Sequence, residues 1–285
     1  MRKYLITIFC FSVFNITFAK NSPLESDPVS NNINTVNQNA KNKLEQKEKN
    51  WNFTFGVGGG YSSSINLGSK KGGVVPALNI IAEYKNIAKI SLSEIQLKAF
   101  SKNGFSVGLV GGIVNAGRKY EDDKDYLQGF EDIGIIGGTG LFMEYISSSF
   151  IAYTDVRYVF RGGINSVLSN INLTYLLPVN KKFMFGFSSI NQITGSQITN
   201  AFFEVDETVH QNTNLELYKP LNKNEITLSN STLLVSGIYL PSAKWSIATS
   251  LGYTIIGNKI ANSPLVKERG RRSSGLVVIE ASYRF

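Results

Sequence analysis

Apolar and polar residues alternate with a period of two through most of the chain from Trp51 to Phe285. Successive side chains of a β-strand point to opposite faces, so this pattern predicts strands with one apolar and one polar face. Segments 51–61, 150–160, 183–187 and 245–255 follow it. The last segment shows it best, with Val277, Ile279, Ala281, Tyr283 and Phe285 on one face and Val278, Glu280, Ser282 and Arg284 on the other.

Further candidate strands bring the count to eleven; they cover residues 76–85, 88–100, 105–115, 133–146, 168–178 and 225–240. In segment 225–240 the apolar face changes sides partway, which predicts a β-bulge. Single-chain bacterial membrane barrels have an even number of strands. We therefore predict twelve strands, with an extra one near residues 201–205. The alternative is ten, if two weak candidates between residues 76 and 115 are one strand.

The connections between these strands alternate in length. Residues 147–149, 178–181 and 240–243 form short turns, whereas residues 117–130, 195–224 and 257–273 form long polar loops. Transmembrane barrels join their strands by short periplasmic turns and longer external loops, and strands of about 9–11 residues cross the hydrocarbon. The sequence thus predicts an all-β transmembrane antiparallel barrel over residues 51–285. A soluble sandwich or an exported eight-stranded barrel is the alternative, but it would turn its apolar face inward.

The N-terminal fifty residues differ in composition from the rest. A basic start at Arg2 and Lys3 precedes an apolar run, and Thr17 and Ala19 place small residues where a signal peptidase cleaves. Residues 1–19 therefore read as a signal peptide, which predicts export. Residues 20–50 have no aromatic residue and are rich in Asn, Lys, Ser and Glu. Such a segment buries too little apolar surface to offset its ordering entropy, so we predict a flexible tether.

The composition of the chain limits the metal, cofactor and catalytic sites that it can form. The chain has one His and one Cys, whereas zinc sites take three or four protein ligands, so no metal and no cofactor is predicted. Loss of Arg2 and Lys3 with the signal peptide lowers the formal net charge from +8 to +6. No base-stacking module accompanies that charge, so nucleic acid is not a predicted partner. His210, near Asp206 and Glu207, could serve a hydrolase at the barrel rim, but no nucleophile motif accompanies it, and no catalytic residue is predicted.

The polar faces of two strands carry charges. Asp155 and Arg157 lie two residues apart, and Glu280 and Arg284 lie on the polar face of the last segment. We predict that these four side chains face the lumen and form pairs there. If they converge, they would narrow or close a pore.

The final segment resembles the C-terminal signal of Gram-negative outer-membrane barrels, which the barrel assembly machinery reads; the matching residues are Val277, Ile279, Tyr283 and Phe285. Three other stretches resemble the MipA/OmpV family of outer-membrane proteins. They contain Gly117 and Arg118, then Leu127, Gly129 and Asp132, and finally Ser263 and Pro264. The chain departs from the family pattern at Phe130-Glu131, where Leu-Gly is usual, and it lacks a Pro-x-Tyr-x-Gly stretch after the first strand.

This resemblance implies a barrel in the Gram-negative outer membrane, in contact with its lipid and lipopolysaccharide. It also implies a role without catalysis, as a scaffold or envelope-interaction protein with a murein transglycosylase or another envelope protein as partner. A small diffusion pore is the alternative, and a rim hydrolase using His210 is the third.

Overall fold

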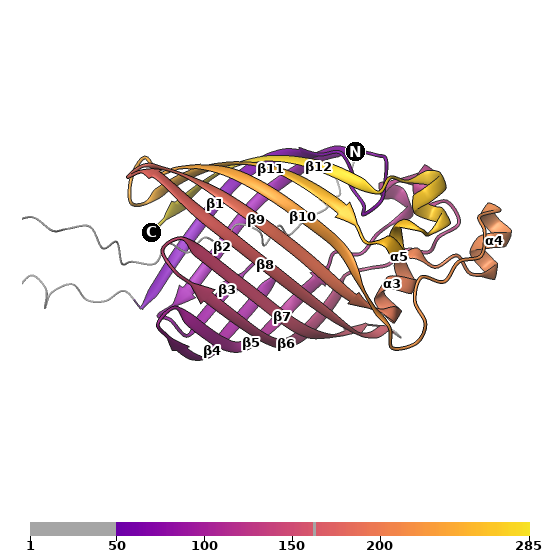
Figure 1. Ribbon diagram of the computed structural model, residues 1–285, viewed down its shortest axis with the longest axis horizontal. Coiled ribbons are helices and arrows are strands. Elements are labelled where there is room, and N and C mark those ends of the chain that lie inside the picture. The colour runs from indigo at the N-terminus through magenta and orange to yellow at the C-terminus, as the bar shows by residue number, and fades with distance from the viewer. Residues whose placement is uncertain (1–49, 162–163) are drawn as a thin grey trace, which may run out of the picture.

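The computed structural model describes residues 50–161 and 164–285 and shows a closed barrel of antiparallel strands (Figure 1). The predicted signal peptide and all but the last residue of the predicted tether lie outside the described residues. Each strand pairs with its neighbours in sequence, and β1 closes the ring against β12. The all-β antiparallel barrel predicted from the sequence is confirmed.

Twelve strands and six short helical segments make up the described chain. The strands are β1 (Trp51–Ser62), β2 (Gly73–Tyr84), β3 (Ala88–Ser91), β4 (Glu94–Lys102), β5 (Phe105–Asn115), β6 (Ile136–Ile146), β7 (Phe150–Arg161), β8 (Ile164–Asn180), β9 (Phe183–Gly195), β10 (Ile226–Tyr239), β11 (Trp245–Ile256) and β12 (Ser273–Arg284). The helical segments are η2 (Tyr120–Asp122), α2 (Lys124–Leu127), α3 (Ser196–Phe203), α4 (Glu207–Thr213), α5 (Asn258–Ala261) and η3 (Leu265–Arg269). None of these helices is long and apolar enough to cross a bilayer.

The predicted count of twelve is confirmed, but the predicted place of the twelfth strand was wrong. Residues 201–205 contain the end of α3 and a single bridge from Val205 to Tyr218. The extra strand comes from segment 88–100, which turns at Leu92 and Ser93 into the short β3 and the longer β4. The bulge predicted within residues 225–240 is present, as a register shift between Leu228 and Asn230.

Apolar side chains cover the outside of the barrel. On β1, Trp51, Phe53, Phe55, Val57 and Tyr61 are 42–56% exposed, and the outward faces of the other strands carry the same kind of residue. Water does not tolerate so large an apolar surface, whereas the hydrocarbon of a bilayer does. The apolar band therefore marks where the barrel crosses the membrane.

Aromatic residues concentrate at the end where the chain joins its strands by short turns. Trp51 contacts Tyr84 at 5.0 Å between ring centroids, and Trp245 contacts Tyr283 at 5.0 Å. Such girdles lie at the level of the lipid headgroups. Because outer-membrane barrels have short turns on the periplasmic side, this end faces the periplasm and the long loops face outward. The first and last residues of the barrel sequence, Trp51 and Phe285, both lie on its periplasmic side.

One part of the wall is interrupted. Strand β3 has only four residues and pairs with Ile81–Tyr84 of β2. Within the described residues no strand pairs with residues 73–80 of β2 on the side away from β1. Pro76, which has no N–H to donate, lies in this stretch, as expected for a proline in a strand with a free edge.

Candidate functional site: a loop cap over a polar lumen

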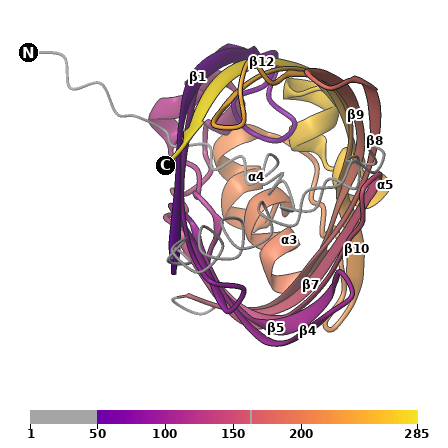
Figure 2. The ribbon, with the colours of Figure 1, turned by 90° about the vertical axis from the view of Figure 1, so that its left-hand side faces the viewer.

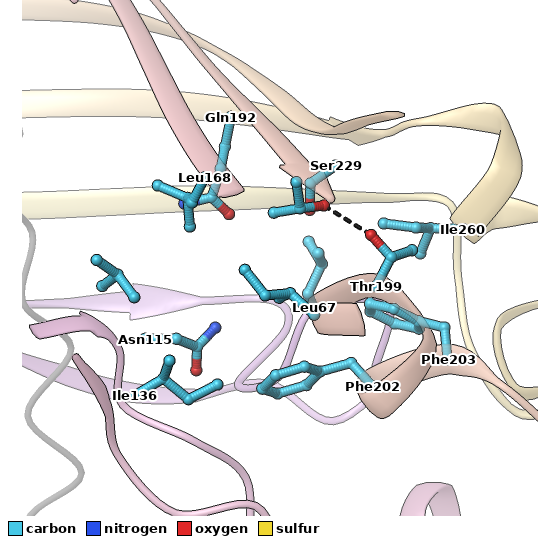
Figure 3. Close-up of a pocket in the computed structure, with 13 residues that line it drawn as sticks. Leu67, Asn115, Ile136, Leu168, Gln192, Thr199, Phe202, Phe203, Ser229 and Ile260 are labelled. Carbon is cyan, nitrogen blue, oxygen red and sulfur yellow. Dashed lines mark hydrogen bonds between the residues drawn. The ribbon is translucent and has the colours of Figure 1, made fainter. Parts of the chain in front are cut away.

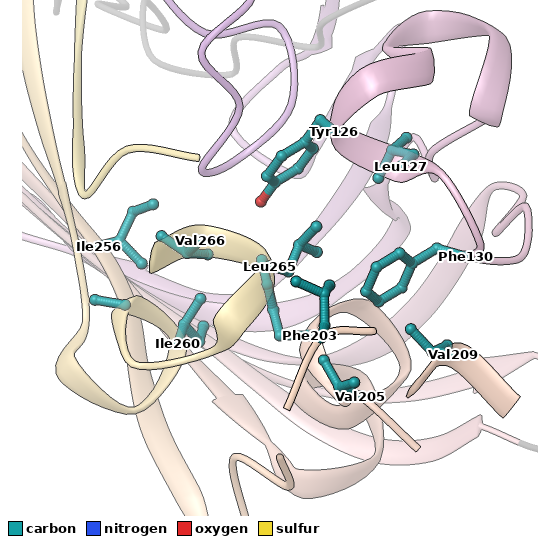
Figure 4. Close-up of a cluster of buried hydrophobic side chains, with 12 residues drawn as sticks. Tyr126, Leu127, Phe130, Phe203, Val205, Val209, Ile256, Ile260, Leu265 and Val266 are labelled. Carbon is teal, nitrogen blue, oxygen red and sulfur yellow. The ribbon is translucent and has the colours of Figure 1, made fainter. Parts of the chain in front are cut away.

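The four long loops fold together over the outer mouth of the barrel. They share a buried apolar cluster, which we call the cap core (Figure 4). Leu67 comes from the first loop and packs at its edge. The buried members are Tyr126, Leu127 and Phe130 from the loop after β5, Phe203, Val205, Val209 and Leu215 from the loop after β9, and Ile256, Ile260, Ala261, Leu265 and Val266 around the loop after β11. Seen from the periplasmic end, α3 and α4 lie across the ring of strands (Figure 2).

Arg118 holds the C-terminal end of α3. Its guanidinium donates to the carbonyl oxygens of Phe202 and, at 3.3 Å, of Ala201. Its Nε donates to the Glu131 carbonyl at 3.4 Å, and the charge lies 5.1 Å from the centroid of the Phe130 ring. The last carbonyls of a helix lack partners within the helix and carry partial negative charge, so a cation there stabilises the helix end.

A second loop binds the same helix end. The Ser263 hydroxyl donates to the Phe203 carbonyl at 2.7 Å, and Ser263 is fully buried. Pro264 follows it and leads into η3. Three successive carbonyls at the end of α3 are thus bound by Arg118 and Ser263, which are 145 positions apart in the sequence. These two residues belong to different motifs of the family resemblance, and the structure brings them together.

The other motif residues shape the loop around Arg118. Gly117 has a φ of 83° and its missing Cβ leaves room for the Ile133 carbonyl, so only glycine fits there. Gly129 has a φ of 82°. Leu127 is 1% exposed within the cap core, and the Asp132 carboxylate accepts from the Tyr120 amide at 2.7 Å. We find these residues building the cap rather than an exposed partner surface.

Burial shifts the pKa of two groups in the cap, Arg118 and Tyr126. It lowers the pKa of the Arg118 guanidinium to about 10, which still leaves the side chain charged at neutral pH. Burial also raises the pKa of the Tyr126 hydroxyl. That hydroxyl stays protonated and donates to the Leu67 carbonyl at 3.1 Å. Arg118 and Tyr126 therefore keep these hydrogen bonds at neutral pH.

Helix α3 closes the lumen beneath the cap core. Ile198 and Phe202 pack on Ile136, Val159 and Leu168 of the barrel wall. The Thr199 hydroxyl contacts that of Thr194 at 2.8 Å, at the junction of β9 and α3 (Figure 3). A cavity of about 40 Å³ remains between the helix and the wall, room for only a few water molecules.

The predicted lumen charges face inward, but the four do not converge. Asp155 and Arg157 are 1% and 4% exposed. Arg157 donates to Asp155 from Nε at 3.0 Å, and its Nη2 pairs with Glu94. Asn170 donates to Asp155 from both its backbone and its side chain.

Across the barrel from this group, Ser282 and Asn79 donate to Glu280 at 2.6 and 3.2 Å, over Gly56, which has no side chain. Arg284 lies 4.0 Å from Glu83. Each group is thus paired on its own part of the wall, so the narrowing predicted for converging charges does not arise. The loops fold over the outer mouth of the barrel, where α3 and α4 lie across the ring of strands.

His210 lies in α4, in the outermost part of the cap. Its Nδ1 contacts the Leu215 carbonyl at 2.6 Å, and its backbone N–H donates to the Asp206 carbonyl. Within residues 50–161 and 164–285 no hydroxyl is hydrogen-bonded to this imidazole, and no three His, Cys, Asp or Glu side chains gather to hold a metal. The geometry gives no support to a rim hydrolase.

The residues of the predicted assembly signal lie on the outer face of β12. Val277, Ile279 and Phe285 are 42–58% exposed, and the Tyr283 ring contacts the Phe285 ring at 4.9 Å between centroids. Their reading by the assembly machinery stays a prediction.

We expect Phe285→Ala to reduce the amount of barrel in the outer membrane about tenfold. The reason is that the assembly machinery is predicted to recognise the terminal aromatic ring, which itself adds little to the packing of the barrel. Fractionated envelopes measure this amount. The same variant should refold from urea into detergent as the parent does, and a folding defect there would contradict a role in recognition.

A family model described as MltA-interacting protein MipA matches residues 55–285. No curated protein matches the chain. Among solved structures, outer-membrane expressed OmpT of Vibrio cholerae matches with 10% identity and a TM-score of 0.37, covering 84% of this chain and 99% of that one. The anion-selective porin from Comamonas acidovorans matches with 7% identity and a TM-score of 0.34, covering 82% and 98%. At such scores these two add nothing to the barrel geometry described above. The chain belongs to the MipA family and is an outer-membrane β-barrel.

Proposed function

We propose that this barrel acts without catalysis as a scaffold in the envelope, and that it is closed to diffusion while its cap is in place. The observation that carries the proposal is the cap core, because a helix fixed at its carbonyl end by Arg118 and Ser263 occupies the outer mouth. A barrel that is closed at its outer mouth and exposed to the periplasm at its other end is better suited to binding a periplasmic partner than to the passage of solutes.

The family description supplies the partner class. MltA-interacting protein names a contact with a murein transglycosylase, and the periplasmic end is where such an enzyme would meet the barrel. Crosslinking of intact envelopes followed by purification of the barrel tests this. We expect a peptidoglycan-processing enzyme among the crosslinked proteins; recovery of assembly factors alone would contradict the scaffold role.

A small diffusion pore is the second candidate, and one observation favours it. The inner faces of β8 to β11 carry uncharged polar side chains such as Asn170, Gln192, Thr194 and Ser250, which suit a water-filled passage. Twelve strands can enclose a lumen, which inward side chains either fill or leave open.

Conductance of the pure protein in planar bilayers separates the two. We expect no stable unitary steps at 0.1 V, because the outer mouth is closed by packed side chains. Stable steps of uniform size from the unaltered protein would establish the pore and demote the scaffold.

A further inference from the structure

The charge of the barrel is unevenly distributed between its two ends. Residues 50–285 contain 22 Lys and Arg against 17 Asp and Glu, a surplus of five. Five lysines lie in or beside the short turns at the periplasmic end, and none of these turns contains an acidic residue. The lysines are Lys85, Lys102, Lys181, Lys182 and Lys244, and all five are exposed. The surplus therefore equals the charge of this rim, and the rest of the described chain is balanced.

The lysines lie directly beside the aromatic girdle. The Lys85 ammonium is 5.5 Å from the centroid of the Tyr84 ring, and the Lys244 ammonium is 5.8 Å from that of Tyr283. Trp51 contacts the first of these rings and Trp245 the second. The two groups, Trp51 with Tyr84 and Lys85, and Trp245 with Tyr283 and Lys244, repeat one arrangement at two places on the rim.

Two of the other three lysines, Lys102 and Lys181, follow an outward apolar residue, and Lys182 is next to Lys181 in the chain. Val179 is 56% exposed and precedes Lys181 by two positions, and Phe100 is 50% exposed and precedes Lys102 by two. The apolar band thus continues to the lysines, which places their ammonium groups where the hydrocarbon ends and the headgroup phosphates begin.

We propose that this lysine rim binds anionic phospholipid headgroups of the inner leaflet of the outer membrane. The lysines occur at four of the five short turns, so they surround the barrel instead of forming one patch. A ring of charge at the edge of the apolar band matches a layer of lipid around the barrel, whereas a docked protein would meet charges gathered on one side. Attraction of a lysine to an anionic lipid surface corresponds to about a fivefold preference, from roughly 1 kcal/mol per residue.

The protein contains its own reporters for this site. It has two tryptophans, Trp51 and Trp245, and both lie beside rim lysines. In vesicles of equal parts phosphatidylglycerol and phosphatidylcholine, brominated acyl chains on one lipid at a time quench these tryptophans according to which lipid lies next to them. We expect quenching to show at least a fivefold preference for phosphatidylglycerol, and this preference should fall in high salt.

The variant Lys85→Gln/Lys244→Gln removes the two charges beside the reporters. Its preference should fall to about one. The matched control, Lys223→Gln/Lys267→Gln, removes two exposed charges at the outer end and should keep the preference of the parent. A shift of mobility on heating in gels verifies that each variant is folded.

Equal quenching by the two lipids in the parent would overturn the proposal, as would a preference unchanged in Lys85→Gln/Lys244→Gln. Sedimentation with purified peptidoglycan tests the other anionic layer. Loss of sedimentation in that variant, together with equal quenching in the parent, would assign the rim to peptidoglycan and reject the lipid site. Neither result depends on whether the barrel conducts or binds a murein enzyme.

Discussion

Replacing Arg118 by alanine is expected to turn a non-conducting barrel into one that conducts ions in planar bilayers. The substitution leaves the carbonyls of Ala201 and Phe202 without their donor and removes the cation beside the Phe130 ring. A hydrogen bond from a charged group contributes about 1.5–3 kcal/mol, so losing these two costs about 3–6 kcal/mol. Since each 1.4 kcal/mol is a factor of ten, the population with a displaced α3 should rise by about two to four powers of ten.

Two control variants isolate the cause. Arg118→Lys keeps the charge but cannot bind several carbonyls at once as the guanidinium does, so it should conduct intermittently. Arg269→Ala removes a partly exposed arginine with one contact, to the Gln128 carbonyl at 2.8 Å, and should stay silent. If Arg118→Ala remains silent while its cap becomes sensitive to protease, the barrel has a second closure and α3 is not the barrier.

The barrel could be predicted from the sequence because each strand that crosses lipid places apolar residues on its outward face. Apolar and polar positions therefore alternate along the strand. A change in the alternation of apolar residues marks the strand that was predicted in the wrong place. Outward residues Ala88, Ile90 and Leu92 occupy even positions, whereas Ile95 and Leu97 occupy odd ones. That change of phase marks the turn between β3 and β4. The turn residues Leu92 and Ser93 include neither glycine nor proline, so the usual turn signals are absent there.

The cap could not be read from the sequence in the same way. Its apolar residues are scattered singly through loops that are otherwise polar, as Val209 and Leu215 are. No period connects them, because they meet only when four loops separated by whole strands fold together. Arg118 and Ser263 were noticed through the family resemblance, but their common target, the end of α3, was itself mistaken for a strand.

We expect Asp155→Ala to lower the free energy of unfolding by about 3–5 kcal/mol, the effect expected when one partner of a buried ion pair is removed. The substitution leaves Arg157 with Glu94 alone and leaves the Asn170 side chain without its acceptor. Urea unfolding of the barrel in lipid vesicles, followed by tryptophan fluorescence, measures this change. Glu280→Ala, on a half-buried residue bound by Ser282 and Asn79, should lower it by only about 1–2 kcal/mol.

This variant also separates stability from closure. Asp155 lies on the wall of β7, whereas the cap is held by contacts between loops, so Asp155→Ala should weaken the barrel and leave it silent in bilayers. Arg118→Ala should do the reverse, with conduction gained and the strands unfolding at nearly the urea concentration of the parent. Conduction in Asp155→Ala would show that the wall charges and the cap act together, and that the lumen is closed by the whole barrel and not by its loops alone.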